Sequence, residues 1–348
     1  MAEVVTANLS AFRRLPKVEL HRHLEGTLRL NTMLEIAQKH HVPIPEDVIS
    51  LSNLVQMQDY DSFTFRTFLS KFDTLRLFYR SPEVIERITR EAVEDAAKDN
   101  VRYMELRFTP VALSRAERFP LHDVMDWVIE ASQAAAREFG ITVRLIPSVN
   151  RHESRELAEQ VAWLAAERRE NCVVGLDLAG NEAEFSSEPF YGVFREAREA
   201  GLHVCIHAGE WGPAEHVREA IERLGADRIA HGVRVLEDEA VTELARGRGT
   251  AFEVCVTSNY QSGVVSEPGS HPLPRMLEKG LNVTVNTDDP SISRITLTNE
   301  YHVVCDELGV PIDGLRACIL AAAKASFLEE EPRRELVESL KAELLRAP

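Results

Sequence analysis

The feature that most constrains the fold is a regular alternation of short apolar segments with amphipathic segments of helical period. From Ser81 onward the order is helix, short turn and apolar strand, and a glycine comes just before four of the strand candidates, at Gly140, Gly201, Gly225 and Gly280. Glycine ends helices readily because it adopts the left-handed conformation without steric cost. The strand candidates are residues 18–23, 101–108, 142–149, 173–178, 203–207, 228–231, 251–256 and 282–287.

Eight strands alternating with helices over 348 residues predict an α/β fold, a (β/α)8 TIM barrel. Extra helices are expected after the first strand, at 31–41, and at the C-terminus, at 299–308, 313–328 and 331–345. No internal repeat or linker indicates a second domain. We therefore expect residues 1–348 to form a single barrel domain.

Composition narrows the possible partners and the location. A net charge of −16 argues against nucleic acid, which basic surfaces bind, and favours a small-molecule ligand. The five cysteines are widely spaced in apolar segments, as expected of free thiols in a reducing compartment. The N-terminus lacks the pattern of a signal peptide, and no apolar run reaches the length of a membrane helix. These patterns predict a cytoplasmic protein with no membrane association, and they leave the oligomeric state open.

The first strand carries a His-x-His pair. Side chains alternate between the two faces of a strand, so His21 and His23 point the same way. An isolated pair of this kind is more often two satisfied polar residues than a metal site. Other ionisable residues at strand ends change that interpretation: His207 and Glu210 end the fifth strand, His231 ends the sixth, and Asp288 and Asp289 end the eighth. In a parallel barrel these ends share one rim, where active sites lie.

The donors His21, His23, His207 and Asp288 suit one Zn²⁺ per chain with an open position for water, although Fe²⁺, Co²⁺ or Mn²⁺ would accept the same ligand types. A second metal is disfavoured because residues 173–180 offer no bridging lysine. The metal would lower the pKa of a water molecule. Glu210 is placed to move a proton, and His231 to accept one or to stabilise charge near the hydroxide.

An aromatic segment follows the first strand. Phe65, Phe68, Leu69 and Phe72 recur at helical spacing, which predicts one apolar helix face. That face either packs on the body of the protein or forms a lid over the pocket.

Six motifs, in order, resemble the adenosine deaminase family over roughly residues 15–309: PKVELHRHLEG at 16–26, LAGNE at 178–182, HAGE at 207–210, IAHG at 229–232, TSN at 257–259 and NTDDP at 286–290. The resemblance implies a hydrolase acting on the C–N bond of a cyclic amidine: zinc-activated water attacks purine C6 of adenosine or 2′-deoxyadenosine, giving inosine or 2′-deoxyinosine and ammonia.

The resemblance also implies roles for individual residues. His21, His23, His207 and Asp288 would bind zinc, with His23 also at the substrate and Asp288 also in the catalytic set. Glu210 would protonate N1, His231 would orient or deprotonate water, Asp289 would bond N7, and the Gly180 amide would meet N3. Phe65, Phe68, Leu69 and Phe72 fall where the family has a gate.

One position departs from the family pattern. Many adenosine deaminases have an aspartate at the position of Glu25, where it contacts the ribose 5′-hydroxyl. Glutamate there is common in adenine deaminases, and 6-amino-6-deoxyfutalosine deaminases share most other motifs, so both substrates remain alternatives. The loops 258–263 and 289–293 favour adenosine. A non-catalytic nucleoside-binding barrel and a hydrolase of non-purine amides or esters are competing classes.

Overall fold

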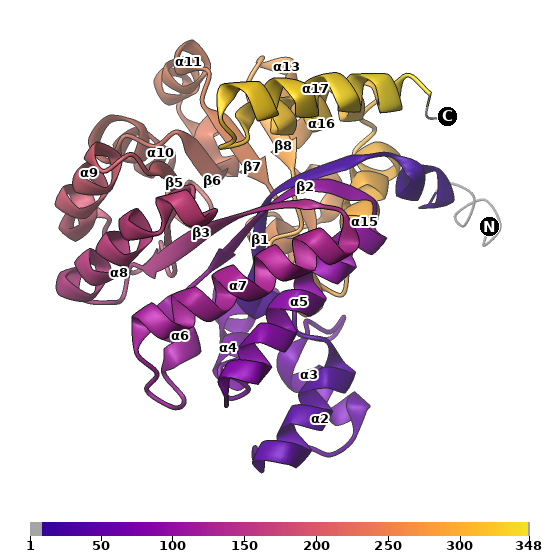
Figure 1. Ribbon diagram of the computed structural model, residues 1–348. Helices are drawn as coiled ribbons and strands as arrows, with labels where there is room; N and C mark the ends of the chain where they lie inside the picture. The colour runs from indigo at the N-terminus through magenta and orange to yellow at the C-terminus, as the bar shows by residue number, and fades with distance from the viewer. Residues whose placement is uncertain (1–8, 347–348) are drawn as a thin grey trace.

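The computed structural model describes residues 9–346 and confirms the predicted barrel (Figure 1). Eight parallel strands lie side by side in chain order, from β1 to β8. Their bounds are β1 Lys17–His23, β2 Val101–Phe108, β3 Thr142–Asn150, β4 Gly175–Ala179, β5 His203–Ala208, β6 Arg228–His231, β7 Ala251–Val254 and β8 Asn282–Val285.

The barrel closes where the chain following β8 meets β1. The amide of Asp288 donates to the carbonyl of His21 at 3.0 Å, and the amide of His23 donates to the carbonyl of Asp288 at 2.8 Å. The side chain of Asn286 accepts from the amide of Leu20 at 2.8 Å. We call this junction the seam; it lies beside the histidines of β1.

Helices surround the strands and cover their outer faces (Figure 1). The longer ones are α5 Pro82–Lys98, α7 Leu121–Phe139, α8 Arg155–Glu167, α9 Tyr191–Glu199, α11 Glu239–Arg248 and α16 Ile312–Ala325. The shorter ones are α6 Pro110–Ser114, α10 Ala214–Glu219, α12 Val256–Gln261, α13 Leu273–Glu278, α14 Pro290–Ser293 and α15 Leu297–His302. Ser81 caps α5 by accepting from the amide of Val84, as its Ser-Pro-Glu opening predicts.

Extra helices follow β1 and lie near the C-terminus as the sequence predicts, but α3 was not predicted. After β1 come α2 Leu30–His40, α3 Val48–Val55 and α4 Phe65–Leu75, and the chain finishes with α17 Glu330–Leu344. Side chains from α16 and α17 pack with Val18 and Leu20 on the outer face of β1. The same alternation turns His21 and His23 inward. Arg22, which faces outward, forms a buried ion pair with Glu19 at 2.7 Å.

Several predicted boundaries are wrong by a few residues. The β4 strand begins at Gly175 rather than at 173, and β7 ends at Val254 because α12 begins at Val256. The helix predicted over 299–308 begins at Leu297 and continues as a π-helical turn over Val303–Glu307. The four glycines that precede strands all have positive φ, between 67° and 88°, which explains why the helices end there.

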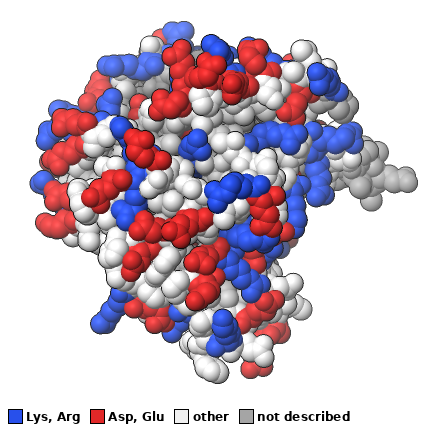
Figure 2. Space-filling model, in the orientation of Figure 1, with Lys and Arg blue, Asp and Glu red and all other residues white. Residues whose placement is uncertain are grey.

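The distribution of charge on the surface and the state of the cysteines agree with what the composition predicts. On the face shown in Figure 2, acidic and basic side chains are interspersed and form no basic stripe. All five cysteines are free. Among residues 9–346, no helix combines the length and the apolar character that crossing a bilayer requires.

Candidate active site

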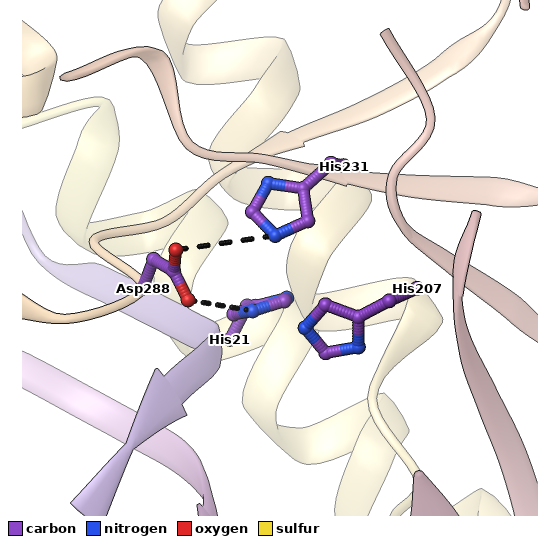
Figure 3. Close-up of side chains that lie close together, drawn as sticks. All are labelled: His21, His207, His231 and Asp288. Atoms are coloured by element: carbon purple, nitrogen blue, oxygen red, sulfur yellow. Dashed lines mark hydrogen bonds and ion pairs between the residues drawn. The ribbon is translucent and has the colours of Figure 1, made fainter. Parts of the chain in front are cut away.

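Four histidines and Asp288 meet at the C-terminal ends of the strands. Figure 3 shows Asp288 with three of them, His21, His207 and His231. Asp288 Oδ1 lies 3.1 Å from His21 Nε2 and 3.3 Å from His23 Nε2. The Nε2 atoms of His23 and His207 are 3.3 Å apart. Potential ligand atoms of His21, His207, His231 and Asp288 all lie within 4.8 Å of one another. The structure therefore brings together every residue predicted to bind the metal, with His231 beside them.

Two of these residues have a strained backbone. His231 and Asp288 have φ of 59° and 65°, the left-handed region that residues other than glycine seldom adopt. Each follows or ends a strand, and the sharp local turn directs its side chain toward the barrel axis. Strain of this kind is typical of functional sites, where the surrounding structure imposes it.

Buried carboxylates orient two of the histidines. His21 Nδ1 lies 3.0 Å from Glu253 Oε2, and His207 Nδ1 lies 3.0 Å from Asp177 Oδ1. Each carboxylate is placed to accept a proton from Nδ1, and Nε2, which points into the cluster, is then the nitrogen that would bind a metal ion. Arg107 Nη1 is 2.8 Å from Nδ1 and 3.5 Å from Nε2 of His21. This nitrogen therefore lies over the face of the imidazole ring and leaves the in-plane position at Nδ1 to the Glu253 carboxylate.

The spacing of the donors also fits a metal ion. Ligand atoms about 2.0–2.1 Å from a tetrahedral ion lie about 3.3 Å from one another. The distances among the Nε2 atoms of His21, His23 and His207 and Asp288 Oδ1 include 3.1, 3.3 and 3.3 Å. The donor set, with the carboxylates of Glu253 and Asp177 beside two of its histidines, thus fits one divalent metal.

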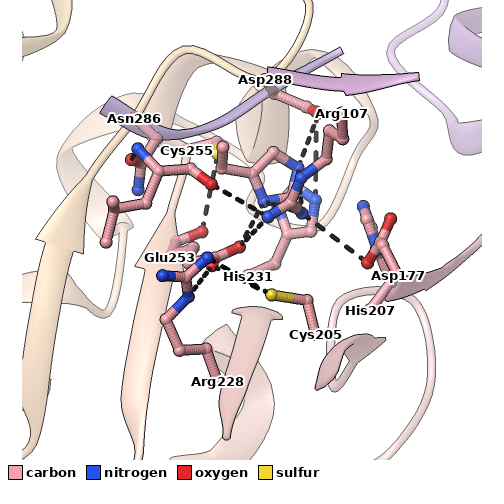
Figure 4. A network of polar contacts seen from close by, with 12 residues as sticks. Arg107, Asp177, Cys205, His207, Arg228, His231, Glu253, Cys255, Asn286 and Asp288 are labelled. Atoms are coloured by element: carbon pink, nitrogen blue, oxygen red, sulfur yellow. Dashed lines mark hydrogen bonds and ion pairs between the residues drawn. The ribbon is translucent and has the colours of Figure 1, made fainter. Parts of the chain in front are cut away.

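A buried ion network lies below the cluster inside the barrel (Figure 4). Glu253 accepts from Arg107 Nη2 at 2.6 Å and forms an ion pair with Arg228 Nε at 2.6 Å. Arg228 also pairs with Glu105, and all four side chains are almost fully buried. The sequence interpretation missed this network. Its only signal was the presence of charged residues at alternate positions within otherwise apolar strands.

Glu210 enters the cavity from a turn that a single carboxylate holds in place. The two oxygens of buried Glu182 accept from the amides of Gly209, Glu210, Trp211 and Gly212, at 2.7–3.0 Å. His216 Nδ1 lies 2.9 Å from the same carboxylate. Glu182 belongs to the LAGNE motif, but its role was not predicted. Burial, with nearby Asp288 and Glu182, raises the pKa of Glu210 well above its ordinary value, which favours its protonated form.

Replacing Glu182 with glutamine should therefore damage the turn. An amide group keeps one acceptor oxygen and presents an N–H to backbone donors, so several buried amides lose their partner. We expect the free energy of unfolding to fall by about 2–3 kcal/mol, as measured by urea denaturation, and kcat to fall with it. Glu184→Gln is the matched control for stability, because Glu184 is half-exposed and two residues away. Equal stability of the two variants would contradict this account of the turn.

Two further acids, Glu25 and Asp289, face the cavity. Glu25 Oε1 accepts from the amide of Thr109 at 2.6 Å. Within the described chain, Glu25 Oε2 and Asp289 Oδ1 are buried without a hydrogen-bond partner. Burial and the neighbouring Asp288, Glu25 and Glu210 carboxylates raise the pKa of Asp289 well above its ordinary value. Asp289 also requires glycine at position 26, because a Cβ added to Gly26 would lie 1.9 Å from Asp289 Oδ1.

These groups line a cavity of about 410 Å³, within the range of small-molecule sites. Phe65, Phe68, Leu69 and Phe72 line it from α4, and Gly180 lines it from the end of β4. The Phe65 and Trp211 rings lie 5.5 Å apart between centroids. The apolar face of α4 therefore packs on the body of the protein and also lies along the cavity. Phe68 is buried, and all four side chains line the cavity.

A parallel barrel with a histidine–carboxylate centre at its C-terminal rim, next to the buried acids Glu210 and Asp289, defines a class: the metal-dependent barrel hydrolases. Comparison with known proteins narrows this class to one family. The sequence model of the family described as Adenosine deaminase matches residues 16–343. The chain belongs to the adenosine deaminase family.

Three relatives illustrate the similarity. An adenosine deaminase of Shigella flexneri is 33% identical over 330 residues, covering 94% of this chain and 98% of the relative. The crystal structure of an adenine deaminase from Arthrobacter aurescens has a TM-score of 0.87 at 27% identity, with coverages of 94% and 98%. An amidohydrolase from Burkholderia ambifaria with bound zinc has a TM-score of 0.89 at 27% identity, with coverages of 97% and 93%.

Proposed function

We propose that this protein is a zinc-dependent adenosine deaminase, which converts adenosine or 2′-deoxyadenosine and water into inosine or 2′-deoxyinosine and ammonia. The observation that carries the proposal is the position of a buried carboxyl group, Glu210, in a cavity lined also by His23, His207 and Asp288 of the histidine cluster. Addition of water to C6 needs both a proton donor at the ring and an activated water molecule.

The residues of the cavity have separate roles in the proposed reaction. A bound metal supplies Lewis-acid activation of water. Glu210 gives its proton to N1, which lets the ring accept electrons as the oxygen adds to C6 and a tetrahedral carbon forms. Asp289, protonated in its buried position, donates a hydrogen bond to N7, and the Gly180 amide meets N3. The two protons of the water molecule balance the step: one restores the acid form of Glu210, and the other passes from the new C6 hydroxyl to the amino group. That group then leaves as ammonia while the C6 carbonyl forms.

Zinc is the proposed metal. The donor set of three imidazoles and one carboxylate matches its preference, and the Burkholderia relative has zinc bound. We propose one ion per chain and one deaminase domain spanning residues 1–348, since the family match reaches from residue 16 to residue 343. The cytoplasmic location remains part of the proposal.

Ultraviolet absorbance tests the substrate assignment, because deamination changes the spectrum of the aminopurine. Zinc-loaded protein is given adenosine, 2′-deoxyadenosine, adenine and 6-amino-6-deoxyfutalosine separately. We expect chelator-sensitive turnover of the first two. Adenine deaminase is the second candidate, favoured by Glu25 and by the similarity to the Arthrobacter enzyme, and preferential turnover of adenine would establish it instead. Turnover of none of the four would overturn the proposal and favour a binding protein.

Glu25→Gln tests how the sugar is recognised. Glutamine can still accept from the Thr109 amide, but it loses the charge at the unpartnered oxygen that faces the cavity. A hydrogen bond to a charged group contributes about 1.5–3 kcal/mol, so kcat/KM for adenosine should fall about 10- to 100-fold. Adenine has no ribose and serves as the internal control, with an expected change below about threefold. Equal losses for both substrates would show that Glu25 does not contact the sugar.

A further inference from the structure

A chain of hydrogen bonds extends from a loop to His231. Its direction is determined by which of its groups can only donate and which can only accept. It begins at the backbone amide of Leu273, which donates to His271 Nδ1 at 3.1 Å. A backbone N–H can only donate, so His271 Nδ1 carries no proton. His271 is buried, and burial lowers its pKa to about 3, so the ring is neutral and its proton is on Nε2.

The next link is the side-chain amide of Asn259. His271 Nε2 lies 3.2 Å from Asn259 Oδ1, and Asn259 Nδ2 lies 3.1 Å from His231 Nδ1. The protonated Nε2 needs an acceptor, which only the amide oxygen provides. The amide NH2 group therefore faces His231 and can only donate. His231 Nδ1 must accept, and the proton of its neutral ring is on Nε2.

We propose that Asn259 and His271 are positioning residues that fix His231 in its Nε2–H form, so that His231 donates a hydrogen bond to the oxygen attacking the substrate instead of taking its proton. His231 Nε2 lies 3.7 Å from Glu210 Oε2 and 3.9 Å from Asp288 Oδ2. Both distances exceed a hydrogen bond, which leaves the N–H available to a third oxygen between them. The kinetic part of this inference rests on the proposed function.

Position and burial support a positioning role. His231, Asn259 and His271 are all almost fully buried. The backbone of Asn259 is anchored on α12, where its carbonyl accepts from Val264 and Val265. His271 is not among the residues that line the cavity, so it acts on the reaction only through Asn259.

The first measurement is the ¹⁵N spectrum of metal-loaded protein labelled at its histidines, because protonated and unprotonated ring nitrogens have separate shifts. Comparison with His231→Gln identifies the His231 signals. We expect unprotonated Nδ1 and protonated Nε2 in the wild type. Asn259→Asp should reverse this pattern, because a carboxylate accepts a proton from Nδ1. A wild-type His231 with its proton on Nδ1 would overturn the proposal, and this spectrum gives an answer even if the protein deaminates no purine.

Kinetics with the preferred substrate are the second measurement. His271→Leu frees the Asn259 amide to rotate, so kcat should fall about 10- to 100-fold with KM changed less than about twofold. His271→Gln should recover most of the loss, because glutamine offers an acceptor to Leu273 and a donor to Asn259. His203→Gln, at the exposed start of β5, is the control. If His271→Leu leaves both kcat and the His231 signals unchanged, the proposal is wrong; if it does not fold, the Asn259→Asp spectrum decides.

Discussion

Glu210→Gln is expected to reduce turnover by about 100- to 10,000-fold, the usual contribution of a positioned general acid. Glutamine has nearly the same shape and can donate a hydrogen bond to N1, but it cannot transfer a proton. Metal content should be unchanged, because Glu210 is not one of the four proposed ligands. The measurements are kcat and the metal content of the purified variant.

Two results would contradict this role of Glu210. One is normal turnover in the glutamine variant. The other is lost turnover together with lost metal, which would make Glu210 a ligand. Glu215→Gln is the control, since Glu215 is exposed and pairs with Arg218 on α10. The raised pKa of Glu210 also fixes the sign of the pH dependence: the acid form is active, so wild-type kcat should decline as pH rises through that pKa.

Asp288→Asn is expected to lower metal affinity by about 100-fold or more, beyond the 10- to 100-fold typical of residues that only orient ligands. Asparagine is chosen over alanine because Asp288 has a φ of 65°, a conformation that asparagine tolerates. It can also keep a hydrogen bond from Ser258, whose hydroxyl donates to Asp288 Oδ2 at 2.7 Å. The backbone of the seam should therefore survive the substitution.

Competition with a chromophoric chelator measures the affinity of this variant, and metal titration shows whether excess zinc restores activity. Asp313→Asn is the control, because Asp313 is exposed at the start of α16. Unchanged metal affinity in Asp288→Asn would remove Asp288 from the ligand set. The remaining candidates would then be His21, His23, His207 and His231, all of which lie in the same cluster.

Local rules were enough to predict the barrel and the rim residues. Apolar strands and glycine helix ends are visible within ten or so residues, and parallel strands place all their C-terminal ends together. His21, His207 and Asp288 could therefore be grouped from positions far apart in the chain. Strand boundaries were less accurate, since the end of β7 depends on where α12 starts and not on apolar character.

The supporting residues could not be predicted in this way. His21 and Glu253 are 232 positions apart, and their pairing depends on how the strands of the barrel are offset from one another. Glu182 occurred within a recognised motif, yet its bonds to four amides of the next loop follow from the path of that loop. The Asn259–His271 contact likewise depends on a turn without periodic pattern.

The seam has a consequence for how the protein would lose its metal. His21 and His23 belong to the first strand and Asp288 to the segment after the last, so one bound ion would join the two edges of the sheet beside the hydrogen bonds that close the seam. Local opening at this junction would separate the donors, and ligand binding to the closed form would oppose it. Amide hydrogens of β1 and of residues 286–288 should then exchange with solvent more slowly as free metal rises, and the rate of metal release would report how often the barrel opens.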